Sequence, residues 1–267
     1  MTASDSTERF GTIPAAAVIA ACLHAQAGVP ARSRFARALG RTPLSADSRP
    51  WYLGALGELR VAAQLAGLGP AWTVLHSVPI GERGSDIDHV VVGPAGVFTI
   101  NTKFHEDARV WVGNRRLMVN GQKTDYLRNS RYEAQRVSRL LSMAIAESVD
   151  VHAAIVLVGA RSMTVREQPT GVAVLRDTEL VRWLKGRPVA LNDDDRDRIA
   201  STLSRREAWS GEPVPEPEID EPAFAHLRRE VTAARRVRLA WATVSLVGVA
   251  TIAGTFAIST YATLFGG

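Results

Sequence analysis

The sequence predicts an α/β domain, in which helices flank a mixed β-sheet, followed by a single transmembrane helix. Two observations carry this prediction. Between residues 51 and 160 the apolar pattern runs from a helical spacing through three short strands to a long helix and a further strand, an order typical of an α/β layer. Near the C-terminus, residues 239–265 contain no charged side chain.

The composition is that of a globular protein with one full-sized domain and appendages. The chain has 267 residues, of which 46% are hydrophobic and 22% charged, values that exclude a disordered or collagen-like protein. The single cysteine, Cys22, excludes an intramolecular disulfide and a cysteine-based zinc cluster. The net charge of +5 favours nucleic acid or anionic lipid as a partner, depending on where the charge lies.

Residues 1–50 are predicted to form an N-terminal helical extension. Within it, residues 13–28 are uncharged and rich in alanine but too short to span a bilayer. Glu8 and Arg9 do not make the basic region of a signal peptide. We therefore expect a buried or amphipathic helix at this position.

The predicted domain, residues 51–209, opens with a helix and three strands. The helix is expected at 51–68, with apolar residues at helical spacing and glycines at its end. The strands are expected at residues 72–78, 86–92 and 96–102, and a Gly-Pro-Ala-Gly turn joins the last two.

The rest of this domain continues the alternation of strands and helices. A Gly-Asn pair predicts a hairpin over residues 109–119. The later elements are expected as a helix at 129–147, strands at 152–158 and 171–175, a helix capped by Asp177, and a short helix from Asn192 to Arg205.

The C-terminal part is predicted to anchor the chain in a membrane. Residues 210–222 are rich in proline and acid, which is typical of an extended linker. Residues 223–267 read as a basic helix that runs into a span at 239–265, longer than the roughly 20 residues that cross a bilayer. The charges before the span are Arg228, Arg229, Arg235, Arg236 and Arg238. The positive-inside bias then predicts a single-pass protein of the cell membrane with a cytoplasmic N-terminal domain.

The predicted core also carries side chains suited to metal-assisted phosphodiester cleavage. Mg²⁺ takes carboxylate oxygens, and a nearby lysine stabilises negative charge on a reacting phosphate. Asp88 lies on the second strand, with Asp86 two residues earlier. Asn101 and Lys103 share one face at the end of the third strand, because side chains alternate. Glu58, on the first helix, is a further acid. Taken singly, each would be an ordinary structural or solvated residue.

Two longer motifs place these residues in a family context. They are IDHVVVGPAGVFTINTK over Ile87–Lys103 and MVNGQKTDYLRN over Met118–Asn129. With the preceding helix, residues 52–159 resemble the nuclease-related (NERD) domain family, a divergent branch of the PD-(D/E)XK nucleases. The resemblance implies a PD-(D/E)XK nuclease-like mixed sheet between helices and a hydrolase that cleaves DNA or RNA with Mg²⁺.

Carried over residue by residue, the resemblance makes Asp88 the metal-binding aspartate, Lys103 the catalytic lysine and Glu58 the glutamate of the opening helix. Asn101 stands where the family has the acid of E-x-K or D-x-K, so the implied metal ligands are Asp88, Glu58 and the amide oxygen of Asn101. An amide oxygen can bind Mg²⁺ but adds no charge. Three alternatives stay open: Asn101 is a neutral ligand, another acid such as Asp86 replaces it, or catalysis is lost.

The helix predicted around residue 129 is a candidate nucleic-acid surface. Its basic residues are Arg128, Arg131, Arg136 and Arg139. They could contact phosphates, or they could form a solvated helix face with Glu133 interspersed.

Two main functions follow from these observations. The chain is either a membrane-anchored, Mg²⁺-dependent nuclease with a weakened site, or a catalytically inactive module that binds nucleic acid or a protein at the membrane. A third alternative, a purely structural role as a membrane scaffold, stays open. No glycine-rich phosphate-binding loop lies between a strand and a helix, so no small-molecule cofactor is expected. The sequence leaves the oligomeric state open.

Overall fold

The computed structural model describes residues 11–80, 85–209 and 219–265. Clustering of contacts divides the chain into two units. The first falls within residues 1–21 and 50–219, and the second within residues 22–49 and 220–267. The expected N-terminal extension therefore contributes to both units. Most of the expected linker, residues 210–218, lies outside the described residues.

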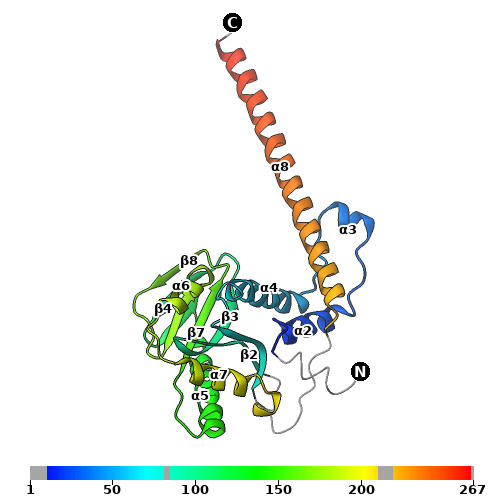
Figure 1. Ribbon diagram of the computed structural model, residues 1–267. Helices are drawn as coiled ribbons and strands as arrows, with labels where there is room; N and C mark the ends of the chain where they lie inside the picture. Colours follow the sequence, from blue (N-terminus) through cyan, green and yellow to red (C-terminus); the bar gives the residue numbers. More distant parts are fainter. Residues whose placement is uncertain (1–10, 81–84, 210–218, 266–267) are drawn as a thin grey trace. The chain divides into compact units, whose positions relative to one another are not determined.

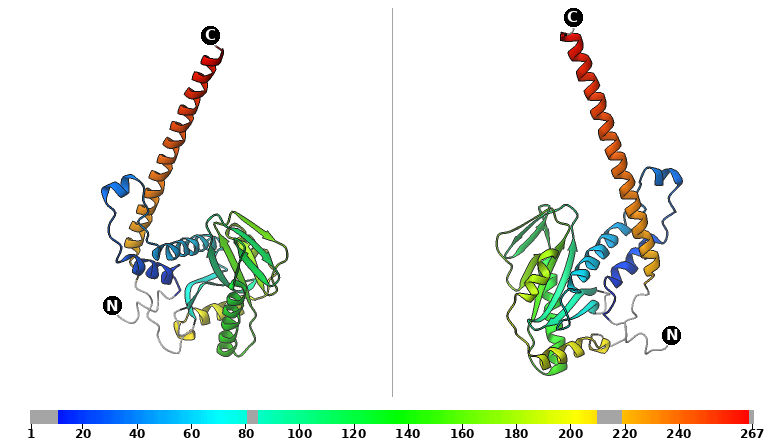
Figure 2. Two further views of the ribbon diagram at one scale, coloured as in Figure 1. Left: turned by 180° about the vertical axis from the view of Figure 1, so that it is seen from behind. Right: turned by 45° about the horizontal axis from the view of Figure 1, so that its top comes forward.

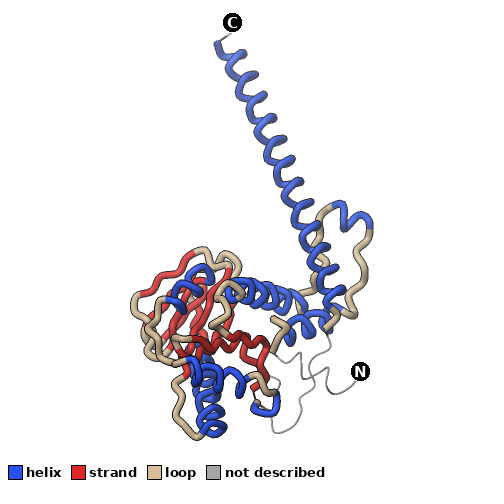
Figure 3. The backbone as a smooth tube through the Cα atoms, viewed as in Figure 1, coloured by secondary structure: helices blue, strands red, loops and turns tan. Residues whose placement is uncertain are grey.

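The first unit is built on a mixed β-sheet, drawn as the main group of arrows in Figure 1 and in red in Figure 3. Its strand order is β1-β2-β3-β7-β9. The strands are β1 (Thr73–Ile80), β2 (Ser85–Gly93), β3 (Gly96–Phe104), β7 (Val151–Val158) and β9 (Val172–Arg176). The first three pair antiparallel, whereas β3, β7 and β9 run parallel. The expected mixed α/β architecture is confirmed.

A smaller sheet with the order β6-β5-β4-β8 completes the first unit. Its strands are β4 (Arg109–Gly113), β5 (Arg116–Val119), β6 (Gln122–Thr124) and β8 (Ser162–Val165). The expected hairpin is the antiparallel pair β4–β5. The parallel pairing of β8 with β4 was not expected from the sequence, because it joins segments some fifty residues apart in the chain and leaves no local pattern.

Helices cover both faces of the larger sheet. Side chains alternate along a strand, so Val97 and Phe98 of β3 point to opposite faces. Val97 packs in a cluster with α5 (Tyr126–Ile145) and α7 (Asp193–Leu203). Phe98 packs in a cluster with α4 (Ser48–Leu65) and α6 (Leu180–Lys185). The sheet is therefore a central layer between two pairs of helices.

Two helix starts differ from the sequence prediction. α5 begins at Tyr126, with Asp125 at its N-cap position, three residues before the expected start. Asp177 does not cap α6 but lies in the 3-10 turn η1 (Asp177–Glu179), where its buried carboxylate accepts a hydrogen bond from Arg60 of α4 at 2.5 Å. The guanidinium of Arg60 thus ties α4 to the end of β9.

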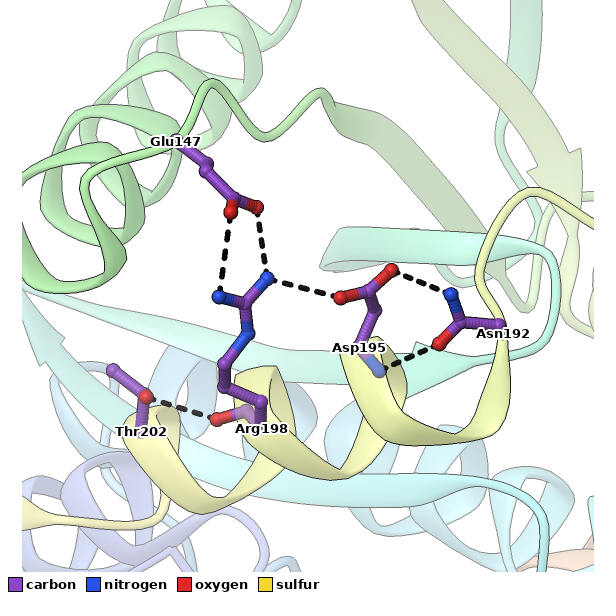
Figure 4. Close-up of polar contacts among 5 residues, drawn as sticks. All are labelled: Glu147, Asn192, Asp195, Arg198 and Thr202. Carbon is purple, nitrogen blue, oxygen red and sulfur yellow. Dashed lines mark hydrogen bonds and ion pairs between the residues drawn. The ribbon is translucent and has the colours of Figure 1, made fainter.

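A surface network links α7 to the end of α5 (Figure 4). Arg198 donates to Glu147 at 2.8 Å and to Asp195 at 2.9 Å. Asn192 caps α7 by accepting from the backbone N–H of Asp195 at 2.8 Å. Because these groups are partly exposed, each ion pair contributes little, about 0–1 kcal/mol.

The second unit contains α3 (Arg34–Ala38) and the long helix α8 (Glu221–Phe265). α2 (Ala16–Gln26), at the site of the expected N-terminal helix, and the 3-10 turn η2 (Arg206–Ala208) are the remaining described helices. α8 begins inside the expected linker, with Pro222 in its first turn, where a missing N–H costs nothing. Among the described residues it alone is long and apolar enough to cross a membrane, by length and composition.

Substitution of Gly93 tests the packing of the β2–β3 turn. A Cβ at this position would overlap the indole ring of Trp72, so Gly93→Ala is expected to lower the free energy of unfolding by about 1–3 kcal/mol. Gly28→Ala is the control, because no heavy atom lies within 4 Å of the added Cβ. Chemical unfolding of both variants in detergent measures the difference. Equal stability of the two variants would contradict the packing described.

Candidate active site

The candidate site lies where β2 and β3 stop pairing. The last registered pair of this ladder is His89 with Ile100. Beyond it, the carboxylate of Asp88 accepts a short hydrogen bond from the backbone N–H of Thr102. A side chain of β2 thus replaces a backbone partner at the point of divergence, and Asp88 is fixed in place between the two strands.

Asn101 is hydrogen-bonded to Glu133, an acid of α5 that lies outside the sequence motifs of the predicted site. Its amide Nδ2 donates to both carboxylate oxygens of Glu133, at 2.8 and 3.0 Å. Both side chains are 7% exposed. Glu133 is therefore not part of a solvated helix face, as the sequence had allowed, but belongs to the buried face of α5 against β3. The structure brings an acid to Asn101 from a different element.

Glu58 and Asp86 complete a group of acids around Lys103. Glu58 of α4 is 5% exposed, and its pKa is raised well above its usual range, mainly by burial and then by the negative charges of Asp88 and Asp86. Lys103 lowers this pKa, as it does those of the other acids. One half-buried cation thus faces the acids Glu58, Asp86, Asp88 and Glu133.

The pKa values of the remaining acids are raised for the same reason. Burial raises the pKa of Asp86 to about 6, with Asp88 adding to the effect. Burial raises the pKa of Glu133 to about 7, although the hydrogen bond from Asn101 opposes the shift. The pKa of Asp88 is also raised by burial, against the pull of Lys103 and Thr102. Removing water from several carboxylates at once disfavours their charged forms.

A tyrosine and a histidine border Lys103. The Lys103 ammonium lies 5.4 Å from the ring centre of Tyr126, at the start of α5. The Tyr126 hydroxyl is 3.2 Å from Nε2 of His105, and the two rings stack. His89, in contrast, pairs with His76 through their Nδ1 atoms at 2.8 Å, and both rings have lowered pKa values because they are buried. Their hydrogen bond joins β1 to β2.

Three of the four arginines of α5, Arg128, Arg131 and Arg139, are not brought to this site. Arg128 pairs with Asp125, Arg131 donates to the carbonyl oxygen of Thr170, and Arg139 donates to that of Gln135. At 100° per residue, Arg128, Arg131 and Arg139 lie on the side of α5 opposite Glu133. Any phosphate contact through them is therefore separate from the acids.

Comparison with known proteins identifies the domain that holds these residues. Residues 53–158 match the NERD family model, described as the nuclease-related domain. The chain contains a nuclease-related domain. Among solved structures, the small subunit of the heterodimeric restriction endonuclease R.BspD6I is similar over 72% of this chain and 91% of that chain, at 12% identity and a TM-score of 0.25, a likeness too weak to transfer anything to this protein. No curated protein matches the chain significantly.

The donor atoms of the site fit a hard divalent cation in their chemistry. Glu58 Oε2 and Asn101 Oδ1 are buried oxygens without a hydrogen-bond partner among the described residues, and such groups are costly unless something binds them. Across that same part of the chain, no three acidic, histidine or cysteine side chains already stand at metal-ligand spacing. Carboxylate and amide oxygens are the ligands that Mg²⁺ prefers.

The sequence carries a signal for Glu133 in the spacing of the buried residues of α5. The buried residues of α5 recur at spacings of three and four, and Glu133 falls among Ser130, Ala134 and Val137. An acid inside the apolar stripe of a helix faces the core. Such a residue is expected to be paired or functional.

Glu133→Gln is expected to change how stability depends on pH in EDTA-treated protein. The folded-state pKa of Glu133, about 7, lies above its usual 4.5, so between these values the folded chain holds a proton that the unfolded chain has lost. The contribution of this carboxyl to stability is thus present at low pH and falls as pH rises through about 4.5–7. Glutamine does not titrate. The free energy of unfolding of Glu133→Gln, relative to that of wild type, should therefore rise by roughly 1–3 kcal/mol between pH 5 and pH 8.

Denaturant unfolding at the two pH values measures this difference. Glu147→Gln, which changes an exposed acid just after α5, is the matched control and should show a much smaller pH effect. The assignment of a buried, proton-binding Glu133 fails if both variants respond to pH alike.

Proposed function

We propose that the nuclease-related domain hydrolyses phosphodiester bonds of DNA or RNA with Mg²⁺, and that Glu133 supplies the acid missing at Asn101. The hydrogen bonds from Asn101 to both oxygens of Glu133 carry this proposal. They put a carboxylate beside the strand position where an acid was expected. Of the three alternatives left open by the sequence, this supports replacement of the acid, but from α5 instead of Asp86.

In this proposal the ligands of Mg²⁺ come from Asp88, Glu58, Glu133 and the Asn101 carbonyl oxygen. The bound ion would polarise a phosphoryl oxygen and lower the pKa of an attacking water. Thr102 N–H and Asn101 Nδ2 hold Asp88 and Glu133 in orientation. Lys103, close to all the acids, stabilises negative charge developing on the phosphate.

We also propose that the domain acts at a membrane, with α8 as a single-pass anchor and the domain in the cytoplasm. The uncharged run at 239–265 supports the span, and the five preceding arginines support the orientation. The nucleic acid would then be met at the inner face of the membrane.

Reciprocal substitution of Asn101 and Glu133 tests the proposed site. Full-length protein in detergent, incubated with linear and circular DNA and with RNA under Mg²⁺ or Mn²⁺, should cleave at least one substrate. Lys103→Ala and Asp88→Ala should abolish cleavage, and Glu133→Gln should lower it about 10- to 100-fold or more. The double variant Asn101→Glu/Glu133→Gln returns the acid to β3 and should recover activity.

Asn101→Glu alone provides the sharpest contrast. It sets a second carboxylate against Glu133 without the amide hydrogen bonds, so it should be less active than the double variant. Glu147→Gln serves as the control and should leave cleavage unchanged. Cleavage by wild type that survives Glu133→Gln undiminished contradicts the role of Glu133, and cleavage that survives Lys103→Ala contradicts the whole site.

A second function, binding of nucleic acid without cleavage, is favoured by a separate surface. Arg136 and Arg139 line a hollow on α5 together with Tyr132 and Met143, which are 52% and 80% exposed. Arginine beside an exposed aromatic ring suits a nucleic-acid strand, because the ring stacks on bases and the guanidinium contacts phosphates.

Charge reversal at this hollow tests nucleic-acid binding independently of cleavage. With labelled DNA in EDTA, Arg136→Glu/Arg139→Glu should weaken binding and reduce the slope of log affinity against log salt concentration by about 2, because each lost phosphate contact removes about 0.9 from the slope. Arg166→Glu, which changes an exposed arginine beyond β8, is the control. Binding that depends on neither salt nor these arginines would exclude this surface.

A further inference from the structure

In the second unit, residues 32–41 form a loop that is closed by its own hydrogen bonds. Arg32 Nη1 donates to the carbonyl oxygen of Arg41 at 2.7 Å, across the base of the loop. Ser33 caps α3 by accepting from the backbone N–H of Ala36 at 3.1 Å. Arg37 Nε donates back to the carbonyl oxygen of Arg32 at 3.1 Å. The loop therefore has a defined shape.

The same loop is fastened to α8. Trp241 Nε1 donates to the carbonyl oxygen of Ala38 at 2.8 Å. Gly40 lies so close to the helix that a Cβ would come within 2.7 Å of the Ala234 carbonyl oxygen, and its φ of +67° favours glycine. Arg32 also pairs with Glu230 at 3.3 Å. In all views α3 lies beside α8 (Figures 1 and 2).

The loop exposes apolar and basic side chains together. Phe35 is 73% exposed and Leu39 40% exposed, and their spacing of four places them on one face of the turn. Arg34, Arg37 and Arg41 are exposed around them, and residues 32–41 contain no acid. Apolar residues beside a basic rim are typical of an element that lies in a membrane interface.

The position of the loop along α8 indicates what this surface contacts. Its contacts on α8 run from residue 230 to Trp241, and the uncharged segment begins at Leu239. The loop is thus fastened where the arginine-rich part of the helix meets the apolar run. Nine arginines and one acid occur in residues 32–41 and 226–241 taken together.

We propose that residues 32–41 form a second membrane-contacting element, which inserts Phe35 and Leu39 among the headgroups of anionic phospholipids while its arginines bind their phosphates. A guanidinium binds phosphate oxygens through paired hydrogen bonds, and Trp241 is placed as an interfacial anchor of α8. This inference rests on the proposed membrane attachment through α8. It favours lipid over nucleic acid because the exposed apolar side chains lie on a loop that is fastened to Trp241, within the uncharged run of the helix.

A fluorescent label at residue 35 tests the insertion in the full-length chain. Phe35→Cys is labelled with an environment-sensitive NBD dye and reconstituted into phosphatidylcholine vesicles with or without phosphatidylglycerol. Cys22 is fully buried, and burial raises its thiol pKa to about 11, so it should react little with the dye. The unsubstituted chain, which has only this cysteine, measures the background labelling. Val189→Cys, at a 77% exposed apolar residue of the first unit, is the matched control, and Val247→Cys reports on the span.

In anionic vesicles the label at 35 should shift to the blue, resist iodide and be quenched by a shallow spin-labelled lipid, whereas the label at 189 should behave as in water. Arg34→Gln/Arg37→Gln should reduce the shift at 35. A solvent-exposed label at 35 beside an inserted label at 247 overturns the loop inference and leaves the span intact. Labels that are solvent-exposed at both positions contradict the proposed membrane span as well.

Three other outcomes also overturn the inference. Equal insertion in neutral and anionic vesicles excludes recognition of the net negative charge of the headgroups. Protection of the label that appears only on adding DNA assigns the surface to nucleic acid. Protection in detergent that grows with protein concentration assigns it to a second copy of the chain.

Discussion

The divergence of β2 from β3 after His89 and Ile100 is the constraint around which the nuclease-related domain is arranged. Two strands that separate leave backbone groups without ladder partners, and such groups must be satisfied when buried. The Asp88 carboxylate does this for Thr102. The same separation makes room for the other acids beside Lys103. A requirement of the backbone therefore also determines where the acids gather.

Burying several carboxylates close together destabilises the fold. Glu58, Asp88 and Glu133 are buried, and the charges of Asp88 and Asp86 raise the pKa values of neighbouring acids. Lys103 is the cation that opposes this, and Asn101 contributes hydrogen bonds without adding a further negative charge. With an amide at this position, a carboxylate can approach from α5 without meeting another carboxylate on β3. The identity of Asn101 thus suits the presence of Glu133.

The sequence predicted those parts of the molecule that depend on local pattern. The order of strands and helices, the β4–β5 hairpin and the long apolar helix follow from periodicity and turn residues, and all are present. Asp88 and Lys103 lie close enough to Glu58 to shift its pKa. Glu133 could not be placed with them from spacing alone, because its contact with Asn101 spans 32 residues. The pairing of β8 with β4 and the attachment of Ala38 to Trp241 are non-local for the same reason.

The hydrogen bonds between Asn101 and Glu133 determine when the acid cluster can be completed during synthesis of the chain. β2 and β3 are made before α5 during synthesis, and they carry Asp88, Asn101 and Lys103. A nascent chain that has folded only this far lacks Glu133, so its acid cluster is incomplete. The cluster is finished only when α5 has emerged and docked on the sheet. Completion of the acid cluster therefore coincides with the docking of α5 on the sheet.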